Sequence, residues 1–250
     1  MQLQEFFKKN PRIAVAFSGG VDSSYLLYAA KEAGCDVHAY LVNAEFQPKF
    51  EIDEAIQMAK QLDVPLTINI MSVFNKPEII ENSSDRCYVC KSIILDQLWS
   101  LARADGFSIL CDGTNADDDE GDRPGMRALR EHSVLSPLRI CGLRKADIRK
   151  LSKEAGLFTH DKPAYACLAT RIPTGTKIIP EYLTMVERAE SALFDMGFSD
   201  FRVRLIPPAT AKIQMPGKQW DEAASRRTEI LKNIGIAGFD CAVLDLTTRD

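Results

Sequence analysis

Two glycines and two serines lie close together near the start of the chain, in the sequence Ser-Gly-Gly-Val-Asp-Ser at residues 18–23. An apolar run precedes them and a helical pattern follows, which predicts a strand, a tight turn and a helix. Glycine lets a backbone approach a ligand closely, and a helix N-terminus offers free N–H groups to a phosphate. Asp22 could cap the helix or help hold Mg²⁺ near the phosphates. The stretch therefore predicts a phosphate-binding loop.

This loop differs from two widespread phosphate-binding loops. It lacks the Gly-Lys-Ser/Thr ending of the Walker A loop, and with it the lysine on the outer phosphates. It also lacks the G-x-G-x-x-G spacing of dinucleotide folds. It resembles instead the S-G-G-x-D-S loop of the N-type ATP pyrophosphatases. That resemblance implies cleavage of ATP between the α and β phosphates, adenylation of a substrate oxygen and displacement of AMP by a nucleophile. The competing interpretation is an ordinary glycine-rich turn.

The chain has seven cysteines, an odd number that is a poor disulfide framework. Cys87 and Cys90 form a C-x-x-C pair, which is typical of a redox dithiol, half of a zinc site or part of an iron–sulfur site. No second C-x-x-C pair or histidine pair completes a zinc site, and with Cys167 three thiolates would suit a cluster with one open iron. Disulfide or persulfide chemistry without a cluster, zinc, and plain core thiols stay open as alternatives. Cys111 and Cys241 lie in apolar runs and are expected in the core.

Three further groups of charged residues stand out. The sequence Asp-Gly-Thr-Asn at residues 112–115 precedes an acidic run, which is either a solvated loop or a loop over the nucleotide. In the second case Asp117 or Asp118 would lie near magnesium and Arg123 near a phosphate. Residues 125–150 are locally basic without interleaved aromatic residues, so base stacking with nucleic acid is poorly supported. Arg202 and Arg204 alternate in a predicted strand, either facing solvent or clamping a phosphate.

The elements that must position these residues alternate between strands and helices. The βαβαβαβ pattern of residues 13–111 predicts an α/β fold, a doubly wound parallel sheet that binds a nucleotide at the carboxyl ends of its strands. Helices are also expected at residues 93–104 and 218–234, with a short extended link at 136–138. Residues 160–180 are irregular and mark a domain boundary. We therefore expect an ATP-pyrophosphatase domain at 1–160 and a small α+β domain for sulfur transfer and substrate binding at 161–250.

Composition limits the partners of this protein. The 250 residues carry a formal net charge of −4, which argues against a protein that coats nucleic acid. No apolar run approaches the roughly 20 residues needed to span a bilayer. The first residues lack the basic-then-apolar layout of a secretion signal. We expect a cytoplasmic protein without a membrane partner.

Four stretches together resemble the LarE family of ATP-dependent sulfur transferases, over nearly the whole chain. They are residues 18–23, 86–91, 112–125 and 162–173. The resemblance implies a role in making the nickel-pincer nucleotide cofactor. Members of the family adenylate the carboxylates of pyridinium-3,5-biscarboxylic acid mononucleotide and replace an oxygen with sulfur. One branch donates the sulfur of its own cysteine, and another holds a [4Fe-4S] cluster on three cysteines.

The resemblance also implies roles for individual residues. Cys87, Cys90 and Cys167 are the catalytic residues and cluster ligands of the three-cysteine branch, with Cys167 the sacrificial donor if no cluster is present. ATP and Mg²⁺ would be bound by Ser18, Gly19, Gly20, Asp22, Ser23, Gly113, Thr114, Asn115 and Arg123. The mononucleotide substrate would be bound by Arg171, Glu190, Arg202 and Arg204. Sulfide or a cysteine-derived sulfur source and a homo-oligomer, a hexamer in the family, are further implied partners.

Two other functions remain open at this stage. The same loop serves enzymes that thiolate tRNA or form amides. A nucleotide sensor or a metal-storage protein would be a non-enzymatic function. An enzyme of either type would form pyrophosphate from ATP, whereas a nucleotide sensor or a metal-storage protein would not.

Overall fold

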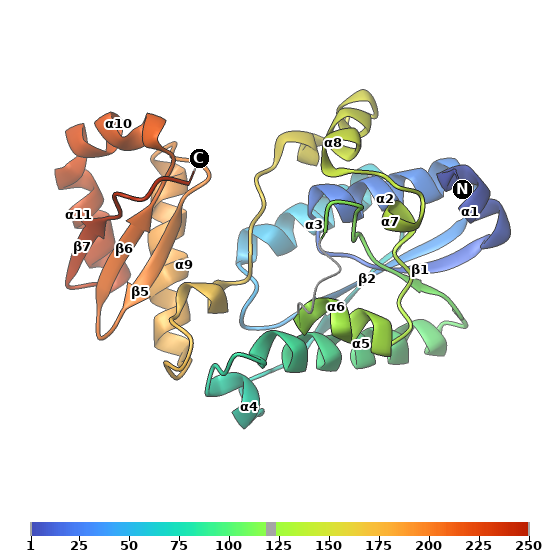
Figure 1. The fold of residues 1–250 in the computed structure, drawn as a ribbon, viewed down its shortest axis with the longest axis horizontal. Coiled ribbons are helices and arrows are strands. Elements are labelled where there is room, and N and C mark those ends of the chain that lie inside the picture. Colours follow the sequence, from blue (N-terminus) through green and yellow to red (C-terminus); the bar gives the residue numbers. More distant parts are fainter. Residues whose placement is uncertain (1, 119–123, 250) are drawn as a thin grey trace. The chain divides into compact units, whose positions relative to one another are not determined.

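The computed structural model describes residues 2–118 and 124–249, which divide into two compact units (Figure 1). Unit 1 comprises Met1–Val73 and Asp85–Lys162, and unit 2 comprises Phe74–Ser84 and Pro163–Asp250. The chain passes from unit 1 to unit 2 for the second time after Lys162, two residues from the predicted boundary at residue 160. The short segment Phe74–Ser84, which the sequence placed in the first domain, belongs to unit 2 instead.

Unit 1 contains a four-stranded parallel sheet in the order β3-β2-β1-β4 (Figure 1). Its strands are β1 (Arg12–Ala16), β2 (Asp36–Asn43), β3 (Leu66–Ile70) and β4 (Leu110–Cys111). In the central strand, Val15 pairs with Ala39 of β2 and with Cys111 of β4. The sheet confirms the predicted α/β class. Because the chain adds β2 and β3 on one side of β1 and β4 on the other, the carboxyl ends of β1 and β4 form a topological switch point, where such sheets bind ligands.

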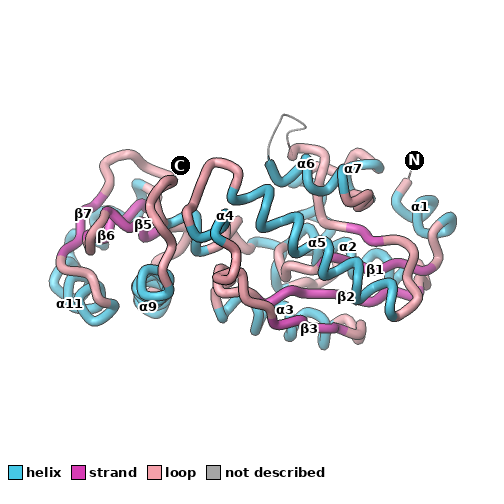
Figure 2. The backbone as a smooth tube through the Cα atoms, turned by 90° about the horizontal axis from the view of Figure 1, so that it is seen from below, coloured by secondary structure: helices cyan, strands magenta, loops and turns pink. Residues whose placement is uncertain are grey.

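Helices cover both faces of this sheet (Figures 1 and 2). The helices of unit 1 are α1 (Leu3–Lys9), α2 (Val21–Glu32), α3 (Lys49–Gln61), α5 (Arg86–Ala104), α6 (Pro124–Glu131), α7 (Pro137–Ile140) and α8 (Lys145–Glu154), with a 3₁₀ turn, η1 (Phe158–Asp161). Val15 and Leu41 face α2 and α3 within one apolar core, whereas Tyr40 and Val42 alternate to the face covered by α5. The strands are therefore buried on both faces, as expected of parallel sheets.

Two predicted elements of unit 1 differ from the structure. Helix α5 begins at Arg86 rather than at residue 93, so the C-x-x-C pair lies in its first turns. The predicted extended link at residues 136–138 is instead the start of helix α7, because Pro137 occupies a first helical position, where its missing N–H costs nothing. Cys111 is fully buried, as predicted.

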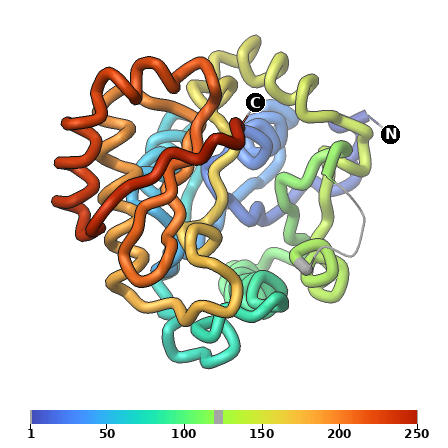
Figure 3. The backbone as a smooth tube through the Cα atoms, turned by 60° about the vertical axis from the view of Figure 1, so that its left-hand side comes forward, coloured from blue at the N-terminus to red at the C-terminus, as the bar shows by residue number. Residues whose placement is uncertain are grey.

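Unit 2 is a small α+β unit with a mixed three-stranded sheet in the order β5-β6-β7 (Figure 1). Its long C-terminal segment is coloured from yellow-orange to red in Figure 3. Its elements are α4 (Pro77–Ile80), η2 (Leu168–Arg171), α9 (Pro180–Asp195), β5 (Arg202–Ile206), β6 (Thr210–Gln214), η3 (Gly217–Gln219), α10 (Trp220–Ser225), α11 (Arg227–Ala237) and β7 (Cys241–Leu244). Strand β6 pairs antiparallel with β5 and parallel with β7. Helices α9 and α11 lie side by side on one face of the sheet (Figure 2).

Two predictions for unit 2 were wrong in detail. The helix expected at residues 218–234 is divided into η3, α10 and α11, with a break at Arg226. Cys241 is exposed rather than in the core, because β7 is an edge strand with little covering it. In the described part of the chain, no helix combines the length and apolar character needed to cross a membrane.

Candidate functional site

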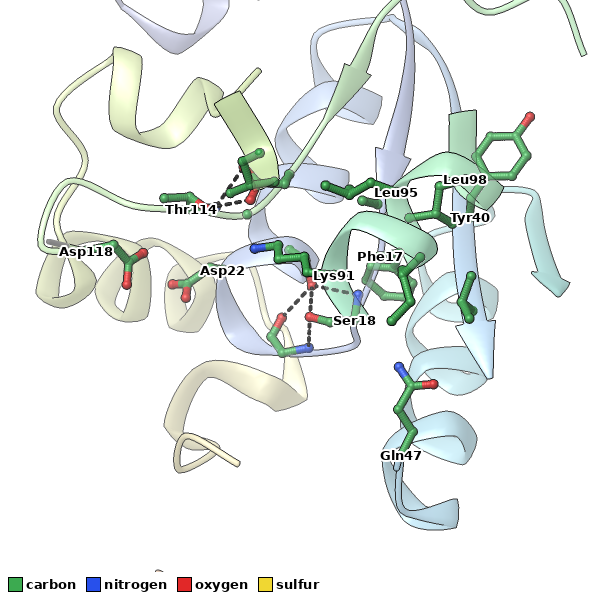
Figure 4. A pocket seen from close by; sticks show the side chains of 18 residues that line it. Phe17, Ser18, Asp22, Tyr40, Gln47, Lys91, Leu95, Leu98, Thr114 and Asp118 are labelled. Atoms are coloured by element: carbon green, nitrogen blue, oxygen red, sulfur yellow. Dashed lines mark hydrogen bonds between the residues drawn. The ribbon is translucent and has the colours of Figure 1, made fainter. Parts of the chain in front are cut away.

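A cavity of about 310 Å³ lies in unit 1 at the carboxyl ends of β1 and β4 (Figure 4). Six residues predicted from the sequence to bind the nucleotide line it: Ser18, Gly20, Asp22, Ser23, Gly113 and Thr114. Its polar wall also includes Lys91, Asp112 and Asp118, and its apolar wall includes Tyr40, Val42 and Leu95. The cavity therefore offers an apolar surface beside a charged one, which suits a nucleotide.

The first wall of the cavity is the loop at residues 18–23. Gly19 has a φ of +72°, and an added Cβ would lie 2.9 Å from the Cβ of Ala55 on α3. The hydroxyl groups of Ser18 and Ser23 lie 3.1 Å apart, and Ser23 Oγ donates to the carbonyl of Gly20 at 3.2 Å. The loop is thus folded back on the first turn of α2, whose free N–H groups face the ligand side of the turn.

The second wall follows β4. Asp112 is buried and accepts hydrogen bonds from Ser136 Oγ at 2.6 Å and from Thr114 Oγ1 at 2.5 Å. A Cβ added to Gly113 would lie only 2.7 Å from the backbone nitrogen of Ser23. Glycine is required at this position because the strand end packs directly on the start of α2.

Asp22 carries the oxygen atom best placed for a cation. Its Oδ2 accepts from Lys145 Nζ at 2.5 Å and from Asn115 Nδ2 at 3.5 Å, while its buried Oδ1 has no hydrogen-bond partner in the part of the chain that the structure describes. Asp22 does not cap α2, since Gly20 is the N-cap residue. A buried carboxylate oxygen beside this cavity is the type of ligand that Mg²⁺ prefers. Asp118 lines the same cavity and fits as a second ligand.

The C-x-x-C pair occupies the first turns of α5. Cys87 is exposed and Cys90 half-buried, neither forms a disulfide with a described residue, and their i, i+3 spacing places them on one side of the helix. Tyr88 between them donates to Glu131 Oε2 at 2.5 Å and lies 3.6 Å below the Arg127 guanidinium, so α6 holds this end of α5 in place. Among residues 2–118 and 124–249, no three His, Cys, Asp or Glu side chains form a metal-binding group.

In unit 2, Cys167 directly precedes η2, in a segment held by Arg171. Arg171 is 1% exposed, and its Nη1 donates to the carbonyl of Ala166 at 2.7 Å and to Thr170 Oγ1 at 2.9 Å. Thr170 Oγ1 in turn donates to the carbonyl of Cys167 at 2.8 Å. The backbone around Cys167 is therefore fixed by a buried guanidinium.

Glu190 on α9 is the counter-ion of Arg171. Its Oε1 accepts from Arg171 Nε at 2.9 Å and from the backbone N–H of Val203 at 2.8 Å. Its Oε2 accepts from Arg171 Nη2 at 3.1 Å and from the hydroxyl of Tyr165. Both oxygens of this buried carboxylate thus have protein donors. Contact of Glu190 or Arg171 with a substrate stays a prediction.

Two further arginines, Arg202 and Arg204, lie on β5 close enough to Arg171 to be affected by its charge. Arg202 is buried, donates to the carbonyls of Phe201 and Ala164, and lies 5.0 Å from the ring centre of Tyr165. Burial, reinforced by the charges of Arg171 and Arg249, lowers the pKa of Arg202 to about 10. The same causes lower the pKa of Arg204, which donates to Gln214 and to the carbonyl of Thr170. Binding of an anion would weaken the repulsion among these guanidinium groups.

Comparisons with known proteins place the chain in a family. A model of "Queuosine biosynthesis protein QueC" matches residues 12–87. An uncharacterized protein from Synechocystis is 33% identical over 98% of this chain and 92% of its own length. The pyridinium-3,5-bisthiocarboxylic acid mononucleotide synthase of Lactiplantibacillus plantarum is 30% identical over 94% of this chain and 86% of its own length. The chain belongs to the LarE family. A tRNA-specific 2-thiouridylase of Clostridium botulinum is more distant, at 25% identity over 60% of this chain.

The structure adds two residues to the site of this LarE-family protein. Lys91 extends from α5 into the cavity (Figure 4), where burial lowers the pKa of its amine and the charges of Asp112 and Asp118 oppose that effect. Lys145 reaches Asp22 from α8. Both supply the positive charge that the loop itself lacks. The only sequence signal for Lys91 is its place four residues after Cys87, on the same side of a helix.

One predicted site residue lies outside the described residues, namely Arg123. The others divide between the units. Unit 1 contains the other residues predicted to bind the nucleotide, together with Cys87 and Cys90. Unit 2 contains Cys167, Arg171, Glu190, Arg202 and Arg204.

Proposed function

We propose that this LarE-family protein uses ATP to adenylate a carboxylate of pyridinium-3,5-biscarboxylic acid mononucleotide and then replaces the activated oxygen with sulfur. The product would be a precursor of the nickel-pincer cofactor. The observation that carries the proposal is the cavity at the switch point, which combines the 18–23 loop, the amine of Lys91 and an Asp22 oxygen that has no hydrogen-bond partner among the described residues. The name of the Lactiplantibacillus relative supports the choice of substrate.

The residues of unit 1 would perform the activation step. The loop and the N-terminus of α2 would bind the phosphates, and Asp22, with Asp118, would hold Mg²⁺. A substrate carboxylate oxygen attacks the α phosphorus, the bond to the β-phosphate oxygen breaks, and pyrophosphate leaves. Lys91 and Lys145 would stabilise the negative charge that develops on these oxygens.

The residues of unit 2 would bind the phosphate of the mononucleotide. Arg202 and Arg204 are neighbours on one face of β5, where burial first, and then the charges of Arg171 and Arg249, lower the pKa of each guanidinium. A phosphate dianion would accept charge-assisted hydrogen bonds from them.

The sulfur would come through three cysteines, Cys87, Cys90 and Cys167. Cys87, Cys90 and Cys167 are each exposed or half-buried, and Cys87 and Cys90 share one side of a helix; three thiolates are the type of ligand that would hold a [4Fe-4S] cluster with one open iron. Such a cluster would supply an open iron that carries sulfide. Without a cluster, Cys167 would give up its own sulfur in a single turnover.

The reaction class is tested by supplying ATP, Mg²⁺ and the biscarboxylic mononucleotide and measuring both phosphate products. We expect pyrophosphate and AMP, formed only when the mononucleotide is present. Formation of orthophosphate and ADP, or no ATP cleavage with any carboxylated acceptor, would refute the proposal. Pyrophosphate formed with tRNA alone would identify a tRNA-modifying enzyme instead.

The sulfur source is tested by anaerobic purification with iron and sulfide analysis. We expect iron and acid-labile sulfide in the wild-type protein, lost in Cys87→Ala while ATP binding remains. Cys241→Ala, which removes another exposed free cysteine, is the matched control and should retain iron. An iron-free protein that transfers sulfur once and converts Cys167 to dehydroalanine would establish the sacrificial route.

A further inference from the structure

The end of unit 1 is held by two cationic side chains that the activation chemistry does not use. Arg149 on α8 donates from Nη1 to the carbonyl of His160 and from Nη2 to the carbonyl of Lys162, both at 2.8 Å. The Lys162 amine lies 3.4 Å from Glu51 Oε1 and contacts Glu54 Oε2, both on α3. We call these four residues, Arg149, Lys162, Glu51 and Glu54, the exit clasp.

The exit clasp is a built feature of the molecule rather than a surface ion pair. The Lys162 side chain is 12% exposed and that of Glu51 17%, so the ammonium group is largely removed from water between two carboxylates. The ring of Phe50 lies 5.6 Å from the same amine. Removing an ammonium group from water costs free energy, and the two nearby carboxylates offset part of that cost.

The exit clasp is connected to the nucleotide loop through α3. Ala55 follows Glu54 directly and is fully buried, and Gly19 of the loop approaches it so closely that a Cβ at Gly19 would lie 2.9 Å away. Helix α3 therefore contacts the 18–23 loop through Ala55, and it contacts Lys162, the last residue of unit 1, through Glu51 and Glu54. Five positions after Lys162 the chain reaches Cys167.

We infer that Lys162 is a positioning residue: the exit clasp fixes, relative to the phosphate loop, the point at which the segment carrying Cys167 leaves the ATP-binding unit. This inference rests on the proposed function. Sulfur transfer needs an encounter between Cys167, or sulfur bound there, and the adenylate. A fixed attachment point raises the effective concentration of Cys167 at the adenylate. Activation of the carboxylate needs no such encounter. Loss of the clasp should therefore slow sulfur transfer and leave adenylation unchanged.

The test is a single-turnover experiment that records pyrophosphate and thiocarboxylate from the same sample. In Lys162→Met we expect thiocarboxylate formation to slow by about tenfold or more, while the pyrophosphate burst stays within about twofold of wild type. Lys162→Arg should restore most of the rate. Lys177→Met is the matched control, since Lys177 makes an exposed pair with Glu81 at 3.7 Å, and it should behave as wild type.

The double variant Glu51→Gln/Glu54→Gln removes the negative charges of the clasp and should also slow thiocarboxylate formation while sparing the pyrophosphate burst. It serves as the test if Lys162→Met folds poorly. Faster amide exchange at residues 160–167 should accompany the slower transfer. Equal loss of pyrophosphate and thiocarboxylate in a folded variant, or no loss of either, would overturn the inference. A wild-type protein that makes no pyrophosphate would instead refute the proposed function.

Discussion

At the scale of single residues, two glycines that pack closely on their neighbours shape the cavity at the carboxyl ends of β1 and β4. Gly113 lies against the backbone of Ser23, and Gly19 lies against Ala55 with a left-handed φ. Neither neighbour is a flexible side chain that could move aside. These two glycines therefore decide how the 18–23 loop meets the strand end and helix α3.

We expect Gly113→Ala to destabilise the protein by about 1–3 kcal/mol, because the new methyl group would overlap the Ser23 backbone. Urea unfolding measures the change. Gly235→Ala is the control: it lies inside helix α11 with open space around it and should raise stability by up to about 1 kcal/mol. Equal effects of the two substitutions would contradict the argument.

Lys91 is the residue whose removal should most directly affect activation. Lys91→Met keeps the length of the buried stem and removes the positive charge, so we expect pyrophosphate formation to fall by about 100-fold with little change in folding. Lys60→Met, which removes an exposed lysine from α3, is the comparison. A pyrophosphate rate unchanged in Lys91→Met would show that the amine does not act on the phosphates.

At the scale of elements, His38 joins two strands of the parallel sheet. Its Nε2 lies 2.8 Å from Thr67 Oγ1 on β3, and its ring stacks on Tyr40 with centroids 4.5 Å apart. Burial lowers the pKa of His38, opposed by the charges of Asp105 and Asp36. The sheet therefore holds this histidine preferentially in its neutral form, which is a structural role, as the sequence indicated.

This lowered pKa predicts a pH dependence of stability. As the pH falls through the ordinary histidine value of about 6.5, the unfolded chain takes up a proton before the folded protein does, so the free energy of unfolding decreases. The loss is complete below the folded-state pKa. Urea unfolding at pH 7.5 and pH 5 should show a smaller decrease for His38→Gln than for wild type. The same decrease in both proteins would exclude His38 as the source.

At the scale of the whole molecule, the chain divides its chemistry between two units. Unit 1 holds the phosphate loop and the C-x-x-C pair, and unit 2 holds Cys167 and the arginines of β5. The chain passes between the units around residues 73–85 and again after Lys162. Activation and sulfur transfer should therefore be separable by substitutions in different units.

Cys167→Ser tests that separation. We expect a pyrophosphate burst within about twofold of wild type and no thiocarboxylate, because an oxygen nucleophile cannot supply sulfur. Cys241→Ser, also in unit 2, should retain both products. Thiocarboxylate formed at the wild-type rate by Cys167→Ser would place the sulfur donor elsewhere.

The sequence by itself determined the strand, turn and helix around residues 18–23, the parallel α/β class and the family, because these depend on local periodicity and on short motifs. Only the tertiary structure decided that Lys91 enters the cavity, that Lys145 reaches Asp22, that Glu190 pairs with Arg171, and that residues 74–84 join unit 2. Lys145 and Asp22 are 123 residues apart, and no local pattern encodes such a pair. It forms only when the sheet order brings α8 beside the start of α2. The phosphate loop could thus be predicted from its own residues, whereas the charges that complete it come from elements that only the fold brings there.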